Sequence, residues 1–266
     1  MINIFYKIAW KFYFILPPHF RQLIKNLLKS GGGHENSLFN KQIALRDAQG
    51  KCSLETATSI FVNYLELSRI NSIEEKKCLE IGVGYVAINS VIMWLLGAKS
   101  IYATDLNKIL VLEALNVACN RFDKTMVYEN LRKYVRNEES LNQKINILYD
   151  YQFKNFEDVD YFFKYKAPFD ILKNKSIEKF DFIFSISVLE HIPPKILNNF
   201  MNSLMDMHEI KGESLHFIDL TDHYDHDENP FGFLSKEYFD YNEDVLADSR
   251  GNRIRSYEWI ELIKNL

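Results

Sequence analysis

Two acidic side chains flank a glycine turn with the spacing of a nucleoside-binding site. Glu80 precedes Gly82 and Gly84, and Asp105 ends the next apolar run along the chain. Glycines let the backbone approach a ligand where a Cβ atom would collide. An acid at the tip of a second parallel strand can accept hydrogen bonds from two ribose hydroxyls. The pattern therefore predicts a nucleoside site recognised by both carboxylates.

The identity of the nucleoside depends on the residues around the turn. A dinucleotide site favours G-x-G-x-x-G, which places a pyrophosphate at a helix N-terminus. Ala87 stands at the third glycine position, a change that this fingerprint tolerates, so the spacing alone leaves NAD open. Glu80 is the stronger discriminator, because a carboxylate there repels a pyrophosphate and attracts a positively charged ligand. S-adenosylmethionine (SAM), with an ammonium and a sulfonium group, is such a ligand.

Two histidines are candidates for proton transfer. His191 follows the fourth predicted strand, and His223 lies in the polar run 219–228 after the fifth. Histidine titrates near neutral pH and can accept a proton from a substrate hydroxyl. For His191, ordering a loop is an equally weighted alternative. The polar run could bind a divalent cation, but its spacing matches no metal motif. We therefore predict substrate contact or acid–base chemistry for His223 and no metal site.

The elements that must position these residues alternate between strands and helices. Apolar runs predict strands at 78–81, 100–104, 159–166, 182–186 and 214–220. Apolar residues at helical spacing predict helices at 53–70, 85–96, 109–120, 196–207 and 257–266. The first strand, the glycine turn, the next helix and the second strand form a βαβ unit.

Two motifs resemble those of the class I SAM-dependent methyltransferases. Residues 79–84, Leu-Glu-Ile-Gly-Val-Gly, are similar to the first motif of that family, and residues 180–192, FDFIFSISVLEHI, resemble its fourth-strand motif. The resemblance covers roughly residues 77–266. It implies a three-layer α/β/α, Rossmann-like sandwich with a mostly parallel sheet. It also implies SAM as the cofactor and an in-line attack of the acceptor on the sulfonium methyl group.

The resemblance further implies which residues bind the cofactor. These residues are Glu80, Gly82, Gly84, Asp105, Leu106, Asp170 and Ser185. In this family an acid just past the third strand accepts a hydrogen bond from the adenine amino group, and Asp170 stands at that place. The alternative for Asp170 is a turn aspartate that binds its own backbone.

The resemblance also bears on the acceptor. His191 and His223 are the candidate catalytic residues. The loop after the fourth strand is not Asn/Asp-Pro-Pro-Tyr, the family's pattern for amide or exocyclic base nitrogens. We therefore expect methyl transfer to an oxygen of a small-molecule or saccharide acceptor.

Composition constrains the partners and the compartment. The chain of 266 residues is 47% hydrophobic and 26% charged, with a net charge of −4. These values are ordinary for a soluble globular protein, and they give no general attraction to nucleic acid. Cys52, Cys78 and Cys119 lie far apart without metal-like spacing. We expect reduced thiols in a cytoplasmic protein, with Cys78 buried in the first strand.

The first thirty residues differ from the rest of the chain. They combine basic and apolar residues, and no acid occurs before Glu35. A helix is predicted at 18–30, with a flexible glycine joint after it. Packing on the sheet is the favoured role, and a basic peripheral anchor at the inner face of a membrane is the alternative. The predicted domains are a helical basic extension at 1–50 and a methyltransferase domain at 51–266.

Two features depart from the family pattern. An insertion at about 121–157 either carries short helices that shape the substrate side or is a solvated insertion. The family's sixth and seventh strands are expected to be missing or supplied elsewhere, which would leave a sheet edge open. A noncatalytic SAM-fold scaffold that binds a partner there is one alternative function. An NAD-linked oxidoreductase and an RNA methyltransferase that contacts phosphate through 1–30 are two others.

Overall fold

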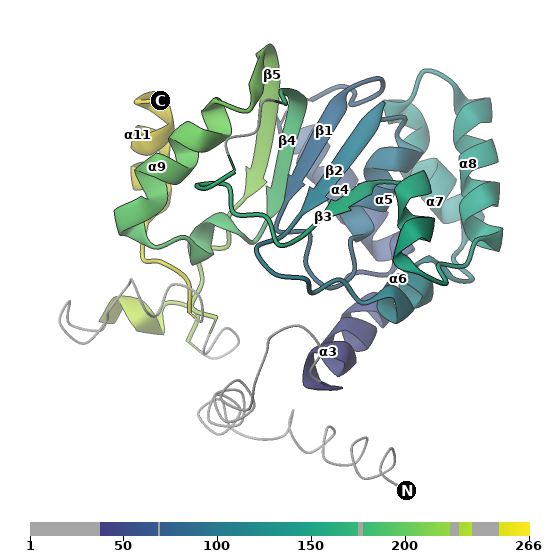
Figure 1. The fold of residues 1–266 in the computed structure, drawn as a ribbon, viewed down its shortest axis with the longest axis horizontal. Coiled ribbons are helices and arrows are strands. Elements are labelled where there is room, and N and C mark those ends of the chain that lie inside the picture. Colours follow the sequence, from purple (N-terminus) through teal and green to yellow (C-terminus); the bar gives the residue numbers. More distant parts are fainter. Residues whose placement is uncertain (1–37, 69, 175–177, 224–228, 236–249) are drawn as a thin grey trace, which may run out of the picture.

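The structure, a computed structural model, describes residues 38–68, 70–174, 178–223, 229–235 and 250–266 (Figure 1). The predicted helix at 18–30 and the expected membrane contact through 1–30 lie outside these residues. Among the helices that are described, none is both long and apolar enough to cross a membrane.

Five parallel strands form one sheet in the order β3-β2-β1-β4-β5. The strands are β1 (Lys77–Ile81), β2 (Ser100–Thr104), β3 (Lys164–Lys166), β4 (Phe180–Ile186) and β5 (His208–Phe217). The chain runs outward from β1 to β3 and then returns to place β4 on the other side of β1. Open α/β sheets bind ligands at the carboxyl ends of the strands, where the strand order reverses in this way. The edge between β1 and β4 is therefore the expected ligand site.

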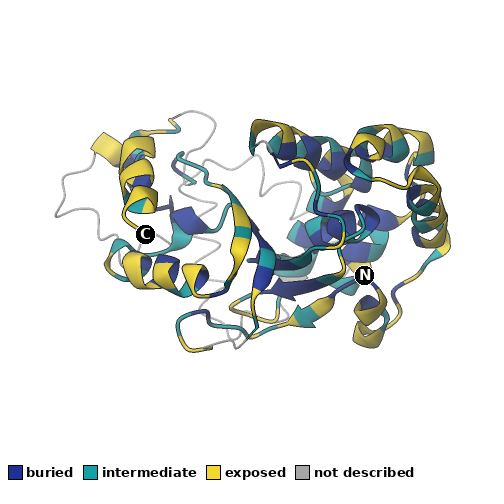
Figure 2. Cartoon of the chain, turned by 90° about the horizontal axis from the view of Figure 1, so that it is seen from above, coloured by how far each residue is buried: buried dark blue, intermediate teal, exposed yellow. Residues whose placement is uncertain are grey.

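Helices cover both faces of the sheet (Figures 1 and 2). The α-helices are α3 (Leu38–Gln49), α4 (Leu54–Ser68), α5 (Ile88–Leu95), α6 (Leu112–Cys119), α7 (Lys124–Leu131), α8 (Glu138–Asp150), α9 (Pro194–Met205) and α11 (Ser256–Lys264). The 3-10 helices are η1 (Arg132–Tyr134), η2 (Phe156–Tyr161), η3 (Leu189–His191) and η4 (Gly232–Ser235). Side chains of α3 to α8 join one apolar core and those of α9 and α11 join a second. The predicted three-layer α/β/α, Rossmann-like sandwich is confirmed.

Alternation along β1 explains the two cores. Cys78 packs in the core under α4 and α5, whereas Leu79 and Ile81 pack in the core under α9. Successive side chains of a strand point to opposite faces of the sheet, so a strand covered on both sides is mostly apolar, and Glu80 is the buried exception in β1. Cys78 is free and buried, and burial raises the pKa of its thiol to about 12. The predicted burial of Cys78 in the first strand is confirmed.

The insertion at 121–157 is largely helical, which was one of the two alternatives that the sequence left open. Asp123 caps α7 by accepting from the backbone N–H groups of Thr125 and Met126, and Asn137 caps α8 in the same way. Leu131, Leu141, Ile145 and Leu148 are buried in the first core. Their spacing and the two caps are helix signals that the abundance of Lys, Asn and Glu obscured. These helices extend the layer beside α4 and α5.

Several element boundaries differ from the prediction, and three of them bear on the site. The third strand is only β3, because residues 156–161 form η2, where the Asn155 and Asp158 side chains cap the turn. Such local hydrogen bonds compete with strand pairing. The fifth strand occupies 208–217 rather than 214–220, and the helix predicted at 85–96 begins at Ile88. Residues 218–220 instead leave the sheet toward the candidate site.

The turn after β1 requires glycine at its two positions for different reasons. Both adopt a positive φ, +69° for Gly82 and +68° for Gly84. A Cβ atom on Gly82 would lie 2.3 Å from Cγ2 of Val188, in the loop after β4, whereas one on Gly84 would meet nothing within 4 Å. Gly82 thus allows the loops after β1 and β4 to touch, and Gly84 leaves space where a ligand can approach.

Replacing each glycine by alanine separates these roles. Both changes carry a strain of about 1–2 kcal/mol from the positive φ. Gly82→Ala adds an overpacking cost of about 1–3 kcal/mol against Val188, so it should lower the free energy of unfolding more than Gly84→Ala. Urea unfolding of the two variants measures the difference. Equal losses in the free energy of unfolding would show that the contact with Val188 does not require glycine at position 82.

Candidate active site

The side chain of Glu80 is buried, and it contacts the first turn of α5, the helix that follows the glycine turn. It lies on β1 with 2% of its surface exposed. Its Oε1 accepts a hydrogen bond from Asn89 Nδ2 at 3.1 Å, and its Oε2 accepts one from the hydroxyl of Ser90. Burial raises the pKa of Glu80 to about 7, against the lowering effect of these two donors, and the charge of Asp105 raises it further.

Asp105 follows β2 and closes the other side of the glycine turn. Its Oδ2 accepts from the backbone N–H of Gly84 at 3.0 Å, and its Oδ1 accepts from that of Asn107 at 3.1 Å. Burial raises the pKa of Asp105 in spite of these bonds. The next residue, Leu106, has 61% of its surface exposed. An acid with an exposed apolar neighbour suits the two sides of a nucleoside, the ribose hydroxyls and the base.

The loop after β3 lies against this acid. The backbone N–H of Phe169 donates to the carbonyl oxygen of Asp105 at 2.7 Å. In the Asp170 side chain, Oδ1 accepts from the N–H of Leu172 at 3.0 Å and Oδ2 forms an ion pair with Lys173. The bond to Lys173 is the main cause that lowers the pKa of Asp170. These contacts match the turn role weighed for Asp170, and they leave lone pairs on both oxygens for a further donor.

The hydroxyl of Ser185 points toward the neighbouring strand β5. It is fully buried on β4, and its Oγ lies 2.7 Å from Nδ1 of His216 on β5. Burial lowers the pKa of His216 to about 4, with a smaller effect from His208, so this imidazole is neutral at physiological pH. Ser187, two residues later, has a φ of +51°. Such backbone strain clusters at functional sites, and here it turns the chain out of β4.

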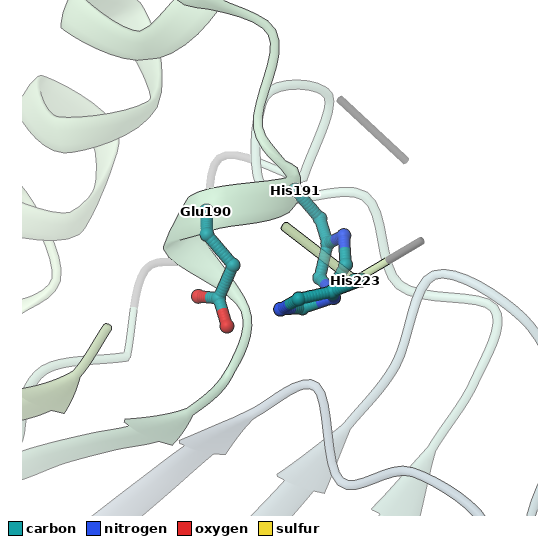
Figure 3. Close-up of side chains that lie close together, drawn as sticks. All are labelled: Glu190, His191 and His223. Atoms are coloured by element: carbon teal, nitrogen blue, oxygen red, sulfur yellow. The ribbon is translucent and has the colours of Figure 1, made fainter. Parts of the chain in front are cut away.

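Three side chains converge beyond the ends of β4 and β5 (Figure 3). Glu190 and His191 belong to η3, and His223 lies in the loop after β5. One ligand atom from each lies within 4.8 Å of the others. The two imidazole rings meet edge to face, with centroids 4.9 Å apart. The structure thus brings together the two histidines that the sequence analysis selected separately.

Glu190 is the member of this group that sequence reasoning missed. It is 1% exposed, and burial raises its pKa to about 7. Neither carboxyl oxygen has a hydrogen-bond partner of normal geometry among the described residues. Polar contacts with the Asp219 backbone and the Ser187 hydroxyl nevertheless offset part of the effect of burial on its pKa. Its position next to His191 was the available signal. An acid in a short helical turn is more often solvated, so it was left out.

The segment before α11 holds these two loops in place. The N–H of Asn252 donates to the carbonyl oxygen of Glu190, and its Nδ2 donates to those of Leu189 and Ile192 at 3.0 Å. Arg250 accepts from the N–H of His223 through its carbonyl oxygen at 3.1 Å. Its guanidinium binds both carboxyl oxygens of the buried Asp222. Charged and amide groups far along the chain thus fix the loops that carry Glu190, His191 and His223.

Comparison with known proteins gives distant structural similarities only. The sequence matches no protein-family model, and no curated protein is similar to it. Magnesium protoporphyrin IX methyltransferase from Synechocystis PCC 6803 is 14% identical with a TM-score of 0.33 over 67% of this chain. A protein from Nostoc punctiforme PCC 73102, provisionally described as an O-methyltransferase, is 13% identical with a TM-score of 0.47 over 95% of this chain.

A third similar structure is phosphoethanolamine N-methyltransferase 1 from Haemonchus contortus, 12% identical with a TM-score of 0.45 over 85% of this chain. The matches span 59%, 63% and 40% of these three proteins, in the order given. At such TM-scores the similarities carry no weight for function, which must be argued from the site itself.

The pKa of Glu80 predicts how stability depends on pH. The ordinary value is 4.5 and the folded value is about 7, so between these pH values the folded protein keeps a proton that the unfolded chain loses. Wild-type stability therefore falls as pH rises through this window, by up to about 3 kcal/mol for this group. Glu80→Gln keeps an acceptor oxygen and removes the titration.

The measurement is urea unfolding of both proteins without ligand from pH 4.5 to pH 8. The variant should gain stability relative to wild type as pH rises, because titrations common to both proteins cancel in the difference. Two parallel profiles would contradict a raised pKa for Glu80.

Proposed function

We propose that this protein is a SAM-dependent methyltransferase that transfers a methyl group to an oxygen of a small-molecule or saccharide acceptor. The observation that carries the proposal is the pair of carboxylates, Glu80 and Asp105, which lie before and after the βαβ unit's glycine turn and are close enough for the charge of Asp105 to raise the pKa of Glu80. Two buried acids whose pKa values are raised by burial favour a ligand that brings positive charge and hydroxyl donors. SAM brings both, whereas NAD brings a pyrophosphate that Glu80 would repel.

Each cofactor-binding residue has a distinct role in this proposal. Glu80 faces the positive methionine end of SAM and fixes the first turn of α5 through Asn89 and Ser90. Asp105 accepts the two ribose hydroxyls, and its bond to Gly84 aligns the glycine turn with it. Gly84 provides the space for the ligand.

The base and the sheet edge complete the proposed cofactor site. Leu106 covers the adenine ring with its exposed side chain, and Asp170 accepts from the adenine amino group with the lone pairs that Leu172 and Lys173 leave. Gly82 and Ser185 support the site without contacting the cofactor. Gly82 lets the two loops touch, and Ser185 ties the end of β4 to His216.

We assign His191 and His223 to the acceptor side of the site. They lie at the carboxyl ends of β4 and β5, and the loop that carries His191 contacts Gly82 through Val188. From there they orient the acceptor oxygen and assist the loss of its proton. The sulfonium is an activated methyl donor, so alignment and proton removal are the main tasks left to the protein.

The reaction conserves atoms and charge. A lone pair of the acceptor oxygen forms the new O–CH₃ bond, and the S–CH₃ bond breaks with its electron pair returning to sulfur. The products are S-adenosylhomocysteine (SAH), the methylated acceptor and the proton of the former hydroxyl. An oxygen acceptor is proposed because the loop after β4 lacks the Asn/Asp-Pro-Pro-Tyr pattern.

Removing the charge of Asp105 tests the cofactor site. Asp105→Asn keeps the side-chain volume but loses charge-assisted hydrogen bonds to the ribose, each worth about 1.5–3 kcal/mol. We expect SAH affinity to fall by about 10- to 100-fold in equilibrium dialysis with labelled SAH. Asp206→Asn, at the exposed end of α9, is the matched control and should bind like wild type. Unchanged affinity in Asp105→Asn would remove Asp105 from the site.

Replacing His191 tests the acceptor side. His191→Ala should lower the turnover of labelled SAM by about 100-fold or more, while SAH affinity stays within about threefold because the cofactor site is intact. Incubation with labelled SAM and cell extract, followed by fractionation, supplies the labelled acceptor for this assay. His208→Ala, at the opposite end of β5, is the control. Wild-type turnover in His191→Ala would exclude a catalytic role.

A further inference from the structure

The group formed by Glu190, His191 and His223 contains an acid that is buried almost completely. Both carboxyl oxygens of Glu190 are buried and lack a hydrogen-bond partner among the described residues. A buried polar group without a partner costs about 1–3 kcal/mol, and a buried charge costs more. Native proteins satisfy nearly all such groups, so an exception at a site calls for a bound water, an ion or a ligand.

The neighbours of this carboxyl group are two imidazoles. The three ligand atoms lie within 4.8 Å of one another, and the side chains point into one space (Figure 3). A tetrahedral ion with ligand bonds of about 2.0–2.2 Å holds its ligand atoms about 3.3–3.6 Å apart. Metal binding therefore requires the three side chains, which belong to two separate loops, to move closer together by up to about 1 Å.

The surroundings hold the group ready for a ligand. Asn252 binds the backbone on both sides of Glu190, and Arg250 holds the backbone of His223. Oδ2 of Asp219 lies 3.5 Å from Nε2 of His223. This carboxylate adds negative charge beside His223, which favours a cation at the group.

We propose that Glu190, His191 and His223 bind one divalent first-row transition-metal ion, with Zn²⁺ as the reference ion. Two imidazoles and one carboxylate form a ligand set that such ions favour, whereas Mg²⁺ and Ca²⁺ favour oxygen ligands throughout. Three protein ligands leave a coordination position open for an oxygen of the acceptor. The sequence analysis weighed a cation only for the polar run 219–228 and expected none there, and it did not consider Glu190 as a ligand.

The inference deepens the proposed function and rests on it for its chemical purpose. The contact between Val188 and Gly82 places the ion's loop beside the glycine turn. A bound cation lowers the pKa of a coordinated hydroxyl and orients it for attack. His191 and His223 would then assist proton loss as ligands of the ion, and the released proton would pass to solvent.

Metal binding is tested on the full chain after dialysis against a chelator. Calorimetric titration with Zn²⁺ should show one equivalent bound per chain, and Co²⁺ should give visible d–d absorption typical of nitrogen and oxygen ligands. Glu190→Gln and His223→Ala should each weaken Zn²⁺ binding by at least about 100-fold, since loss of an outer partner alone costs about 10- to 100-fold. His208→Ala should bind like wild type.

Folding of the variants is checked in the same metal-free samples. Glu190→Gln removes a buried charge, so its melting temperature should be at least that of metal-free wild type, and Zn²⁺ should raise the melting temperature of wild type and His208→Ala only. If either variant fails to fold, His191→Ala, a change at a partly exposed ligand, takes its place. No binding by folded wild type, or equal affinity in all variants, would overturn the inference.

SAH binding measured in parallel separates the two proposals. Zn²⁺ binding through these three residues without any affinity for SAH would sustain the metal site and reject the cofactor proposal. SAH binding without stoichiometric Zn²⁺ binding would do the reverse.

Discussion

The burial of the Glu80 carboxyl group is the constraint on which the candidate site depends. Folding removes this acid from water, and the two side-chain donors of α5 do not offset the effect on its pKa, which rises to about 7. A carboxyl group kept at such a cost in a central strand weakens the apoprotein, as functional groups often do. A cationic ligand beside Gly84 would recover this free energy on binding, because its charge favours the ionised form.

The close contact of two loops joins the proposed cofactor side of the site to its proposed acceptor side. Gly82 has no side chain, so Val188 can lie against the turn after β1. Three residues past Val188 stands His191, and Asn252 and Arg250 hold the loops of η3 and His223 together. The reversal of strand order between β1 and β4 is what brings these segments to one edge. The geometry of methyl transfer would thus be set by backbone contacts rather than by long flexible side chains.

The parts of the fold predicted well from sequence are those with strong local signals. Hydrophobic periodicity and the Gly and Pro residues at element ends predict the apolar strands β1, β2 and β4, the glycine turn and the helix α9. For α7 and α8 the polar composition left a solvated insertion open beside short helices. The start of β5 could not be predicted, because residues 208–213 are largely exposed edge positions whose pairing with β4 depends on tertiary context.

The candidate site was predictable only in part, because some of its residues meet only through tertiary contacts. Glu80 and Asp105 are fixed by one βαβ unit, so their proximity follows from local spacing. The group of Glu190, His191 and His223 depends on the adjacency of β4 and β5 and on bonds from Asn252, which lies some sixty residues beyond Leu189. No pattern in the sequence reports that His223 faces Glu190, or that the acid is buried.

The most direct test of the central claim is calorimetric titration of folded wild-type protein with SAH and, separately, with NADH. The account predicts binding of one equivalent of SAH per chain and no measurable heat with NADH, because Glu80 accommodates a positive methionine end and excludes a pyrophosphate. Binding of NADH without binding of SAH would contradict it.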